Sequence, residues 1–499
     1  MTSPPGFNLA AHVLEAARRM PAKPALLVFD DPDAEPAETW SYGRLAEAVA
    51  RAAGRLATLG LAPGDRVLLR IGHRSAFPVA FLGAIRAGLV AIPASAALTP
   101  REVAWIAADS GAAAIVHDGE ASLPEGGFAG PLLDAADLHG PELPAAATTA
   151  GDPAFLVYTS GTSGTPKGVL HAQRVILGRR PMHDGWYGLT EDDVLVHAGS
   201  FNWTYTLGTG LMDPWTAGAT SVVFRGEAGP AVWSRLIERA GATMFAAVPS
   251  LYRRILKYDA LTPARMPTLR HGLTAGEALR PELHAAWLSA TGRPLYEALG
   301  MSEISTYVSS APAVPTRPGS PGRPQPGRRV AILPADGGDT PLPPGPSGVV
   351  AVHRSDPGLM LGYWRRPDET AAAMRGDWFL TGDRGRFDAD GYLWFEGRGD
   401  DTMNAFGYRV APEEVEAAIA GHPDIAEAGV TETRAGEVSV ITAFVVPREG
   451  AALVPAALDA HVAERLADYK RPRRWVAVDA LPRTANGKVI RRALPALAD

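Results

Sequence analysis

The residues with the clearest chemical potential form one short loop, which reads YTSGTSGTPKG over residues 158–168. It directly follows an apolar run, 154–158, that predicts a strand, and ligands of α/β proteins gather at the ends of such strands. Its glycines allow positive φ angles and close approach of the backbone. Consecutive backbone N–H groups in such a loop form a concave anion site. Because hydroxyl groups and Lys167 add further donors, we predict that the loop binds phosphate.

The loop differs from the P-loop of nucleoside triphosphatases. That motif needs a serine or threonine after its lysine to bind magnesium, whereas Gly168 follows Lys167 and Pro166 precedes it. A flexible linker is the other interpretation of a Ser/Gly-rich stretch, but a position at the end of a strand favours a phosphate site. The residues predicted to contact phosphate are Thr159, Ser160, Gly161, Thr162, Ser163, Gly164 and Lys167.

Alternating helix and strand signals surround the loop and must position it. Apolar periodicity predicts helices over 8–20 and 41–59, and VLLRI at 67–71 predicts a buried strand. The alternation continues towards residue 310 and predicts α/β layers with a largely parallel sheet. Segments rich in proline and glycine then predict short strands between turns. A helix–strand–helix pattern over 401–499 predicts a compact α+β tail.

The composition excludes several classes of function. The 499 residues are 46% hydrophobic and 20% charged, and the net charge of −6 gives no support for nucleic-acid or membrane-surface binding. No apolar run reaches the roughly 18 residues of a membrane span, and the N-terminus shows no signal-peptide pattern. We therefore expect a cytoplasmic protein with no nucleic-acid or integral membrane contact. Because the chain has no cysteine, any thiol chemistry needs a thiol carried by a substrate.

Five further motifs follow the loop in order. They are GLTAGEAL (272–279), EALGMSE (297–303), WFLTGDRGRFDADGYLWFEGR (378–398), GDDTMNAFGYRVAPEEVE (399–416) and PRTANGKVIRR (482–492). Together with the loop they resemble the motifs of the adenylate-forming superfamily, which comprises acyl-CoA synthetases, peptide-synthetase adenylation domains and luciferases. Their spelling is most similar to that of benzoate-like and short- or medium-chain acid–CoA ligases. The resemblance spans essentially the whole chain, with Ser302 standing where the family more often has threonine.

The resemblance implies an α/β fold in two domains. A large N-terminal domain over 1–397 would hold two layered α/β subdomains and a small β-rich part at about 310–397. A hinge at 398–400 would join it to a small, mobile α+β C-terminal domain over 401–499.

The resemblance also implies the activity of an AMP-forming acyl-CoA synthetase. Such an enzyme joins a carboxylic acid to ATP as acyl-AMP with release of pyrophosphate, and then transfers the acyl group to coenzyme A. The carboxylate has a pKa of about 4 and is already ionised at pH 7, so the protein must supply cations and donors rather than a base. The implied cofactors are ATP, Mg²⁺ and, as co-substrate, coenzyme A. A stand-alone adenylating enzyme that loads a carrier-protein thiol is the alternative, and a homodimer remains open.

Individual roles are carried over from the resemblance. Lys488 would bridge the carboxylate and the nucleotide, Glu303 would bind Mg²⁺, and Lys167 would hold the departing pyrophosphate. Asp383 would accept the ribose hydroxyls, and Arg398 would hold ribose or phosphate. The remaining nucleotide contacts would be Gly276, Glu277, Ala278, Glu297, Ala298, Leu299, Gly300, Met301, Ser302 and Phe395.

The thioester step would use the C-terminal domain. By resemblance, Asp400 is the hinge acid about which that domain turns, Gly407 lines the thiol's tunnel, and Arg409 contacts a phosphate of coenzyme A. A thiol with a pKa of about 8.5 is partly ionised at pH 7, which is enough to attack an acyl adenylate.

The acid would bind beside HAGSFNWTYTLGTG (197–210). By resemblance, Trp203, Thr204 and Tyr205 line the acyl pocket, with Ala275 among the residues opposite. By resemblance, amino-acid-activating domains have an aspartate where Thr204 stands, and burying an ammonium group unpaired is costly. This argues against an α-amino acid. Aromatic side chains suit an aryl acid or a short- to medium-chain acid, and both remain open.

Four other polar residues receive structural assignments. His171 and His197 are predicted to be structural rather than catalytic. Glu413 and Glu414 follow Pro412 at an expected helix start, where acidic side chains favour the helix dipole.

Overall fold

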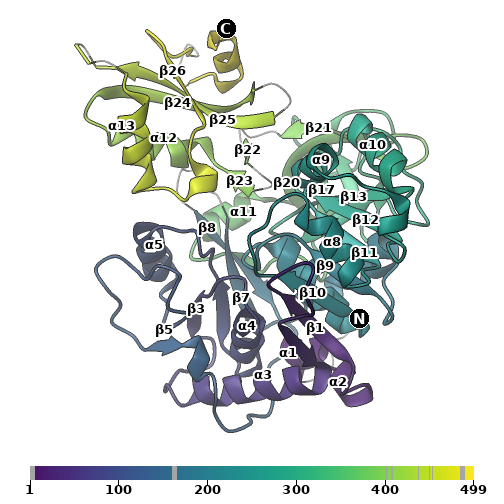
Figure 1. Ribbon diagram of the computed structural model, residues 1–499. Coiled ribbons are helices and arrows are strands. Elements are labelled where there is room, and N and C mark those ends of the chain that lie inside the picture. The colour runs from purple at the N-terminus through teal and green to yellow at the C-terminus, as the bar shows by residue number, and fades with distance from the viewer. Residues whose placement is uncertain are drawn as a thin grey trace.

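The computed structural model describes residues 6–159, 166–398, 403–405, 408–435, 438–448, 450–451, 453–483 and 489–498. Two large, mainly parallel sheets and a small β-rich part form the bulk of the molecule, and a smaller sheet with its own helices sits against them at the C-terminal end (Figure 1). This arrangement confirms the α/β fold class. No helix in the described part of the chain is long and apolar enough to span a membrane.

A seven-stranded sheet carries the strand that precedes the phosphate loop. Its order is β18 (Gly362–Tyr363), β8 (Lys167–Ala172), β7 (Pro153–Thr159), β4 (Val90–Pro93), β3 (Arg66–Arg70), β5 (Ala114–His117) and β6 (Leu132–Asp134). The strands from β7 to β6 run parallel, whereas β8 returns antiparallel to β7. The loop therefore connects two antiparallel strands, rather than a strand and a helix.

A nine-stranded sheet carries the GLTAGEAL and EALGMSE motifs. Its order is β15 (Arg323–Pro324), β14 (Ser305–Ser309), β13 (Leu295–Met301), β12 (His271–Ala275), β11 (Met244–Ala247), β9 (Val194–His197), β10 (Thr220–Phe224), β1 (Pro24–Phe29) and β2 (Glu38–Ser41). The strands from β13 to β1 are parallel. Their shared edge can therefore gather the residues that follow each strand.

Helices cover these sheets. They are α3 (Tyr42–Ala57), α4 (Ala76–Arg86), α5 (Pro100–Ser110), α6 (Val175–Met182), α7 (Asp213–Ala217), α8 (Val232–Arg239), α9 (Pro249–Tyr258), α10 (Pro281–Thr291) and α11 (Pro367–Ala372). The turn η2 (His183–Tyr187) continues α6, and η3 (Thr206–Met212) leads into α7. The predicted helix at 41–59 is confirmed as α3, with Ser41 as its N-cap.

One predicted helix is wrong in form. Residues 8–20 form two short helices, α1 (Leu9–Val13) and α2 (Ala16–Arg19), instead of a single one. The break lets α1 pack on α4 while α2 packs on α3. Tertiary packing has therefore overridden local helix propensity, which is a weak preference.

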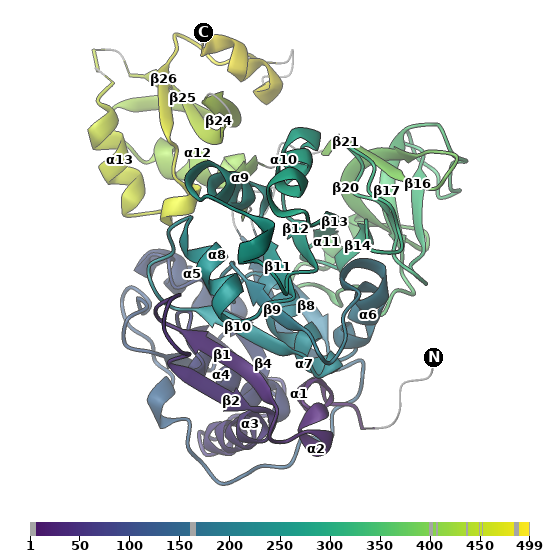
Figure 2. The same cartoon turned by 45° about the vertical axis from the view of Figure 1, so that its right-hand side comes forward.

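The C-terminal part follows a small antiparallel sheet made of β16 (Val330–Leu333), β17 (Gly348–His353), β19 (Met374–Arg375), β20 (Trp378–Phe387) and β21 (Leu393–Arg398). It contains the β22–β23 hairpin (Met403–Ala405 and Tyr408–Val410), β24 (Ile425–Ala435), β25 (Val438–Pro447), β26 (Arg474–Ala477), α12 (Pro412–Ala420) and α13 (Pro455–Ala463). Figure 1 shows the hairpin at the junction between this part and the rest of the chain, and Figure 2 shows the C-terminal sheet and its helices from another side.

Candidate active site

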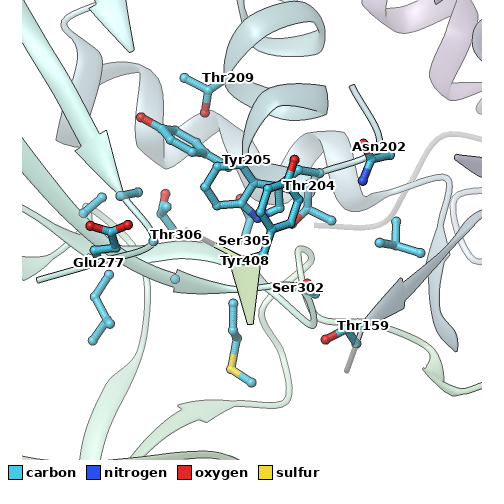
Figure 3. A pocket seen from close by; sticks show the side chains of 18 of the residues that line it. Thr159, Asn202, Thr204, Tyr205, Thr209, Glu277, Ser302, Ser305, Thr306 and Tyr408 are labelled. Atoms are coloured by element: carbon cyan, nitrogen blue, oxygen red, sulfur yellow. The ribbon is translucent and has the colours of Figure 1, made fainter. Parts of the chain in front are cut away.

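A cavity of about 320 Å³ opens where β7, β12 and β13 end. Most of the predicted site residues lie in its wall, and several are visible in Figure 3. These residues are Thr159, Trp203, Thr204, Tyr205, Ala275, Gly276, Glu277, Ala278, Glu297, Ala298, Leu299, Gly300, Met301, Ser302, Asp383 and Phe395. The structure thus brings together residues from segments up to 236 positions apart (159 to 395).

Several predicted residues cannot be placed. Ser160, Gly161, Thr162, Ser163, Gly164, Asp400, Gly407 and Lys488 lie outside the described residues. Arg398 ends β21 and Arg409 lies in β23, but the description does not extend to their side chains. The roles assigned to all of these residues stay predictions.

Lys167 and Glu303 meet through one tyrosine beside the cavity. The Lys167 ammonium lies 3.8 Å from the centre of the Tyr363 ring and 3.7 Å from a Glu369 oxygen. The Tyr363 hydroxyl donates to Oε1 of Glu303 at 2.8 Å. Neither Lys167 nor Glu303 lines the cavity itself, but their neighbours Pro166 and Ser302 do. Both charges therefore lie beside the end of the cavity that is predicted to bind phosphate.

The Glu303 carboxylate is chemically suited to a divalent cation. Its side chain is buried, and within the described residues its Oε2 atom has no hydrogen-bond partner. Mg²⁺ is commonly held by one or two carboxylates together with substrate phosphates, rather than by an all-protein cage. Accordingly, no group of three or more His, Cys, Asp or Glu side chains in the described residues could hold a metal ion alone.

His171 on β8 supports the same segment. Its Nε2–H donates to the carbonyl of Ser302 at 2.9 Å. Burial lowers the pKa of His171 to about 4, so the ring is neutral at pH 7. The contact joins the strand after the phosphate loop to the residue that precedes Glu303.

Two carboxylates hold the turn that follows β12. Glu297 accepts the backbone N–H of Leu279 at 2.9 Å, and burial raises the pKa of Glu297 to about 7, partly offset by that bond. Glu277 accepts the Ser250 hydroxyl at 2.9 Å. Asp383, on the other side of the cavity, is buried and accepts the Tyr307 hydroxyl at 3.1 Å. The predicted nucleotide contacts are therefore locked in place by hydrogen bonds.

Three aromatic rings meet at the end of the cavity that is predicted to bind the acid. Trp203 meets Tyr205 edge-on, with ring centres 5.1 Å apart, and stacks on Tyr408 at 5.6 Å. Figure 3 shows Tyr408 beside Thr204 and Tyr205. Tyr408 comes from the C-terminal hairpin. It had no predicted role, because only the adjacent Gly407 was assigned to the thiol tunnel.

Hydroxyl groups form another wall, which the sequence analysis missed. Thr209, Ser305 and Thr306 line the cavity. A buried arginine, Arg179, bonds to both oxygens of Asp213, at 2.7 and 2.6 Å, and also donates to the Ser305 hydroxyl.

The Arg179–Asp213 pair is fully enclosed. The Tyr187 hydroxyl donates to Asp213 at 2.7 Å and shares a hydrogen bond of 2.8 Å with Thr209. Although burial alone would raise the pKa of Asp213, its attraction to Arg179 keeps that pKa below the usual value. No sequence motif marks this pair, since 34 positions separate its two members.

The C-terminal part also contributes Met403, Tyr469 and Lys470 to the cavity wall. By contrast, the described residues that flank Lys488 lie elsewhere. Arg483 pairs with Glu427, and Val489 packs against a small core of the C-terminal sheet, so neither lines the cavity. The hairpin side of this part therefore faces the site.

A second cavity, of about 720 Å³, lies between α9 and the C-terminal sheet. Its wall contains four arginines, Arg253, Arg280, Arg434 and Arg474. Glu277 and Ala278 line both cavities, so the two adjoin. No local motif marks this cluster, because its arginines lie in four separate segments of the chain.

Comparison with known proteins gives a consistent picture. Residues 13–364 match the model of the AMP-binding enzyme family, and residues 414–488 match that of the AMP-binding enzyme C-terminal domain. The chain is 31% identical to a 3-hydroxybenzoate–CoA ligase of Aromatoleum sp., over 91% of this chain and 90% of the relative. It is 32% identical to the human mitochondrial acyl-coenzyme A synthetase ACSM5, over 98% and 90%.

Solved structures differ in how well they superpose. The o-succinylbenzoate CoA synthetase of Bacillus subtilis, bound to its product analogue OSB-NCoA, gives a TM-score of 0.86 at 25% identity, over 99% of this chain and 98% of that one. ATP-bound MatB of Rhodopseudomonas palustris gives 0.73 at 28% identity, over 98% of each chain. The better superposition thus belongs to the less similar sequence.

Proposed function

This chain belongs to the AMP-binding enzyme family and is an AMP-forming acid–CoA ligase that uses ATP, coenzyme A and a carboxylic acid, and we propose that its acid is a compact aromatic one. The observation that carries the proposal is the acyl end of the cavity, where Trp203, Tyr205 and Tyr408 meet. Aromatic rings prefer offset-stacked or edge-on contacts with one another, which a flat acid can share.

The hydroxyl wall extends this argument. Thr209, Ser305 and Thr306 lie on a cavity that is otherwise bounded largely by apolar and aromatic groups. Hydroxyls can donate and accept, so they accommodate a polar ring substituent that a plain alkyl chain would leave unmatched. A short- or medium-chain acid is the second candidate, because ACSM5 is as similar to this chain as the hydroxybenzoate ligase is.

The proposed roles divide between the two half-reactions. An acid oxygen attacks the α-phosphorus, the bond to pyrophosphate breaks, and acyl-AMP forms while Lys488 and Lys167 stabilise the phosphate charge. Glu303 would hold the Mg²⁺ that neutralises charge on the triphosphate. The thiol sulfur then loses its proton and attacks the acyl carbonyl, and AMP leaves with the electrons of the broken C–O bond. Localised positive charge at the phosphates lowers the first barrier.

We also propose that the arginine-lined cavity receives the phosphates of coenzyme A. Arginine binds phosphate through paired N–H donors, and this cavity adjoins the one predicted to hold the adenylate. Arg434 and Arg474 supply its C-terminal side, in addition to the predicted contact by Arg409.

We further propose that the C-terminal part has the orientation of the thioester-forming step in this structure. The hairpin residue Tyr408 lies in the cavity wall, whereas the neighbours of Lys488 do not. The superposition also favours the complex with a CoA product analogue over the ATP-bound one. A location in the cytoplasm and assembly as a homodimer stay predictions.

The test is an acid panel with ATP and Mg²⁺, with and without coenzyme A. Benzoate, 3-hydroxybenzoate, hexanoate and octanoate are compared by kcat/KM for AMP release. We expect kcat/KM for the two aromatic acids to be about tenfold higher than for the aliphatic acids, which is the discrimination that one or two good contacts provide. If the aliphatic acids have the higher kcat/KM, the proposed acid is wrong.

The arginine-lined cavity is tested with Arg474→Ala and the best acid. This variant should raise the KM for coenzyme A and leave the KM for ATP unchanged, and equal increases of both KM values would refute the assignment of this cavity to the phosphates of coenzyme A.

A further inference from the structure

One ion pair joins the C-terminal part to the seven-stranded sheet. Lys470 lies in the turn η5 (Asp468–Lys470), and its side chain is buried. Its ammonium donates to Glu414, at the start of α12, at 2.6 Å and to Glu102, at the start of α5, at 2.9 Å. Glu414 belongs to the same part of the chain as Lys470, whereas Glu102 belongs to the N-terminal part.

Glu102 divides its carboxylate between two tasks. Oε2 accepts the backbone N–H and the hydroxyl of Thr99, each at 2.9 Å, and so completes the capping box of α5. Oε1 receives Lys470. If the two parts separate, Glu102 keeps its capping bonds and Lys470 keeps Glu414. Since Lys470 keeps an anionic partner and Glu102 keeps hydrogen bonds from Thr99, the contact can open without the large cost of stranding a buried ion with no partner.

The same turn supports the acyl end of the site. Tyr469, next to Lys470, stacks on Tyr408 with ring centres 4.3 Å apart. Tyr408 in turn stacks on Trp203 at 5.6 Å. A continuous set of contacts therefore runs from the wall of the acyl pocket to the ion pair between the two parts.

We propose that Lys470 is a positioning residue for the thioester-forming step, acting through its bond to Glu102. The pair holds the C-terminal part in the orientation that places Tyr408 against Trp203, and it opens when that part turns to bring Lys488 to the cavity. Lys470 touches neither of the bonds that change. The inference rests on the two-step reaction and the domain orientation proposed above, and it holds whichever acid is bound.

The kinetic test uses Glu102→Gln. Glutamine can keep the capping box but removes the charge that pairs with Lys470. We expect thioester formation from supplied benzoyl adenylate and coenzyme A to fall about tenfold, a typical size for coupling between sites. Adenylation, measured by benzoate-dependent ATP–pyrophosphate exchange, should stay within about twofold. Equal losses in both half-reactions, or no loss in either, would overturn the proposal.

Two further variants show whether the pair is responsible. Glu464→Gln removes an exposed carboxylate that pairs with Arg465 inside the C-terminal part, and it should leave both half-reactions unchanged. Lys470→Gln, which also removes the bond to Glu414, should show the same selective loss. Adding Glu102→Gln to it should change little, because the Lys470–Glu102 contact is already absent. Additive losses would show that the two residues act separately and would refute the pair.

A substrate-independent readout separates this proposal from the choice of acid. The chain has no cysteine, so Ala108→Cys on α5 and Ala460→Cys on α13, both exposed, give two unique sites for spin labels. In the otherwise unchanged protein we expect a main short-distance population, and Glu102→Gln should shift it to a broader, longer one. An unchanged distance distribution would overturn the proposal even if the panel supports an aromatic acid. A wrong acid would leave this measurement unaffected.

Discussion

At the scale of single residues, the Glu303 carboxylate is unusual because its two oxygens differ in their hydrogen bonding. The Oε2 atom of Glu303 is buried with no hydrogen-bond partner in the described structure, while Oε1 is held by Tyr363. Leaving a buried carboxylate oxygen unsatisfied is costly, and a metal–phosphate complex would remove that cost. The proposed role of Glu303 in binding Mg²⁺ therefore predicts that ligand binding stabilises the protein at this point.

We therefore expect Glu303→Gln to separate stability from activity. The amide removes the anionic oxygen, so adenylation should fall by about 100-fold or more, as when one transition-state contact is lost. Stability without ligand should be unchanged or slightly higher, because a neutral group replaces a buried charge. The measurements are ATP–pyrophosphate exchange against Mg²⁺ concentration and a thermal melt. Glu47→Gln, at an exposed carboxylate on α3 that pairs with Arg51, is the control, and an equal loss there would refute the metal assignment.

At the scale of elements, the turn η3 and helix α6 hold the hydroxyl wall. Gly208 in η3 lies against the guanidinium of Arg179, and a Cβ atom at this position would come within 2.0 Å of its Nη2 atom. Turns with wider helical spacing are often found at functional sites. Here the missing side chain lets Arg179 reach both Asp213 and Ser305.

Gly208→Ala should consequently disturb the acyl pocket through Arg179. We expect a loss of about 1–3 kcal/mol in the free energy of unfolding from overpacking and a raised KM for the acid with little change in the KM for ATP. Urea denaturation and steady-state kinetics provide the two measurements. Gly229→Ala, where a Cβ atom meets nothing within 4 Å, is the matched control. If both variants behave alike, the contact with Arg179 does not matter.

Three histidines with buried rings, in or near strands of the two large sheets, make the stability of the fold depend on pH. Burial lowers the pKa of His73 and His171 to about 4 and that of His197 to about 3. In the unfolded chain each takes up its proton near pH 6.5. Their contribution to stability is therefore complete above pH 6.5 and is lost as the pH falls towards 4.

When the pH is lowered from 7.5 to 5, we expect each of these histidines to lower the free energy of unfolding by about 2 kcal/mol, at roughly 1.4 kcal/mol per pKa unit. Urea midpoints at the two pH values measure the loss. His197→Gln should flatten the dependence, whereas His139→Gln, at an exposed position, should leave it unchanged. A dependence that His197→Gln does not reduce would show that other groups control the acid limb.

At the scale of the whole molecule, the proposed mechanism needs two surfaces of the C-terminal part to face one cavity in turn. The hairpin surface occupies the cavity wall here, and Arg483 and Val489, on either side of Lys488, lie away from it. If each half-reaction uses a different surface, substitutions on the two surfaces should affect different halves. This is a direct consequence of one site and two orientations.

Lys488→Ala should accordingly reduce adenylation by about 100-fold or more while largely sparing thioester formation from supplied acyl adenylate. Gly407→Leu should mainly reduce the thioester half-reaction. The two half-reactions are measured separately for each variant, with Arg492→Ala as a nearby exposed control. Equal losses of both halves in Lys488→Ala would refute the division of labour.

The sequence by itself determined the family, the order of the motifs and a large part of the cavity wall. Sixteen of the predicted site residues line one cavity because each lies in, or next to, a short motif whose local chemistry can be recognised. Helix α3 was equally predictable, since its cap and apolar spacing are local features.

Tertiary structure decided what no local pattern could encode. The Arg179–Asp213 pair, the arginine cavity and the Lys470–Glu102 contact each join segments that are remote along the chain. The last of these spans 368 positions. Such groups are assembled only when sheets and domains pack, because the interaction energy of two buried charges depends on their separation in the folded structure. The two short helices at 8–20 have the same cause, since packing on different neighbours outweighed a weak local preference.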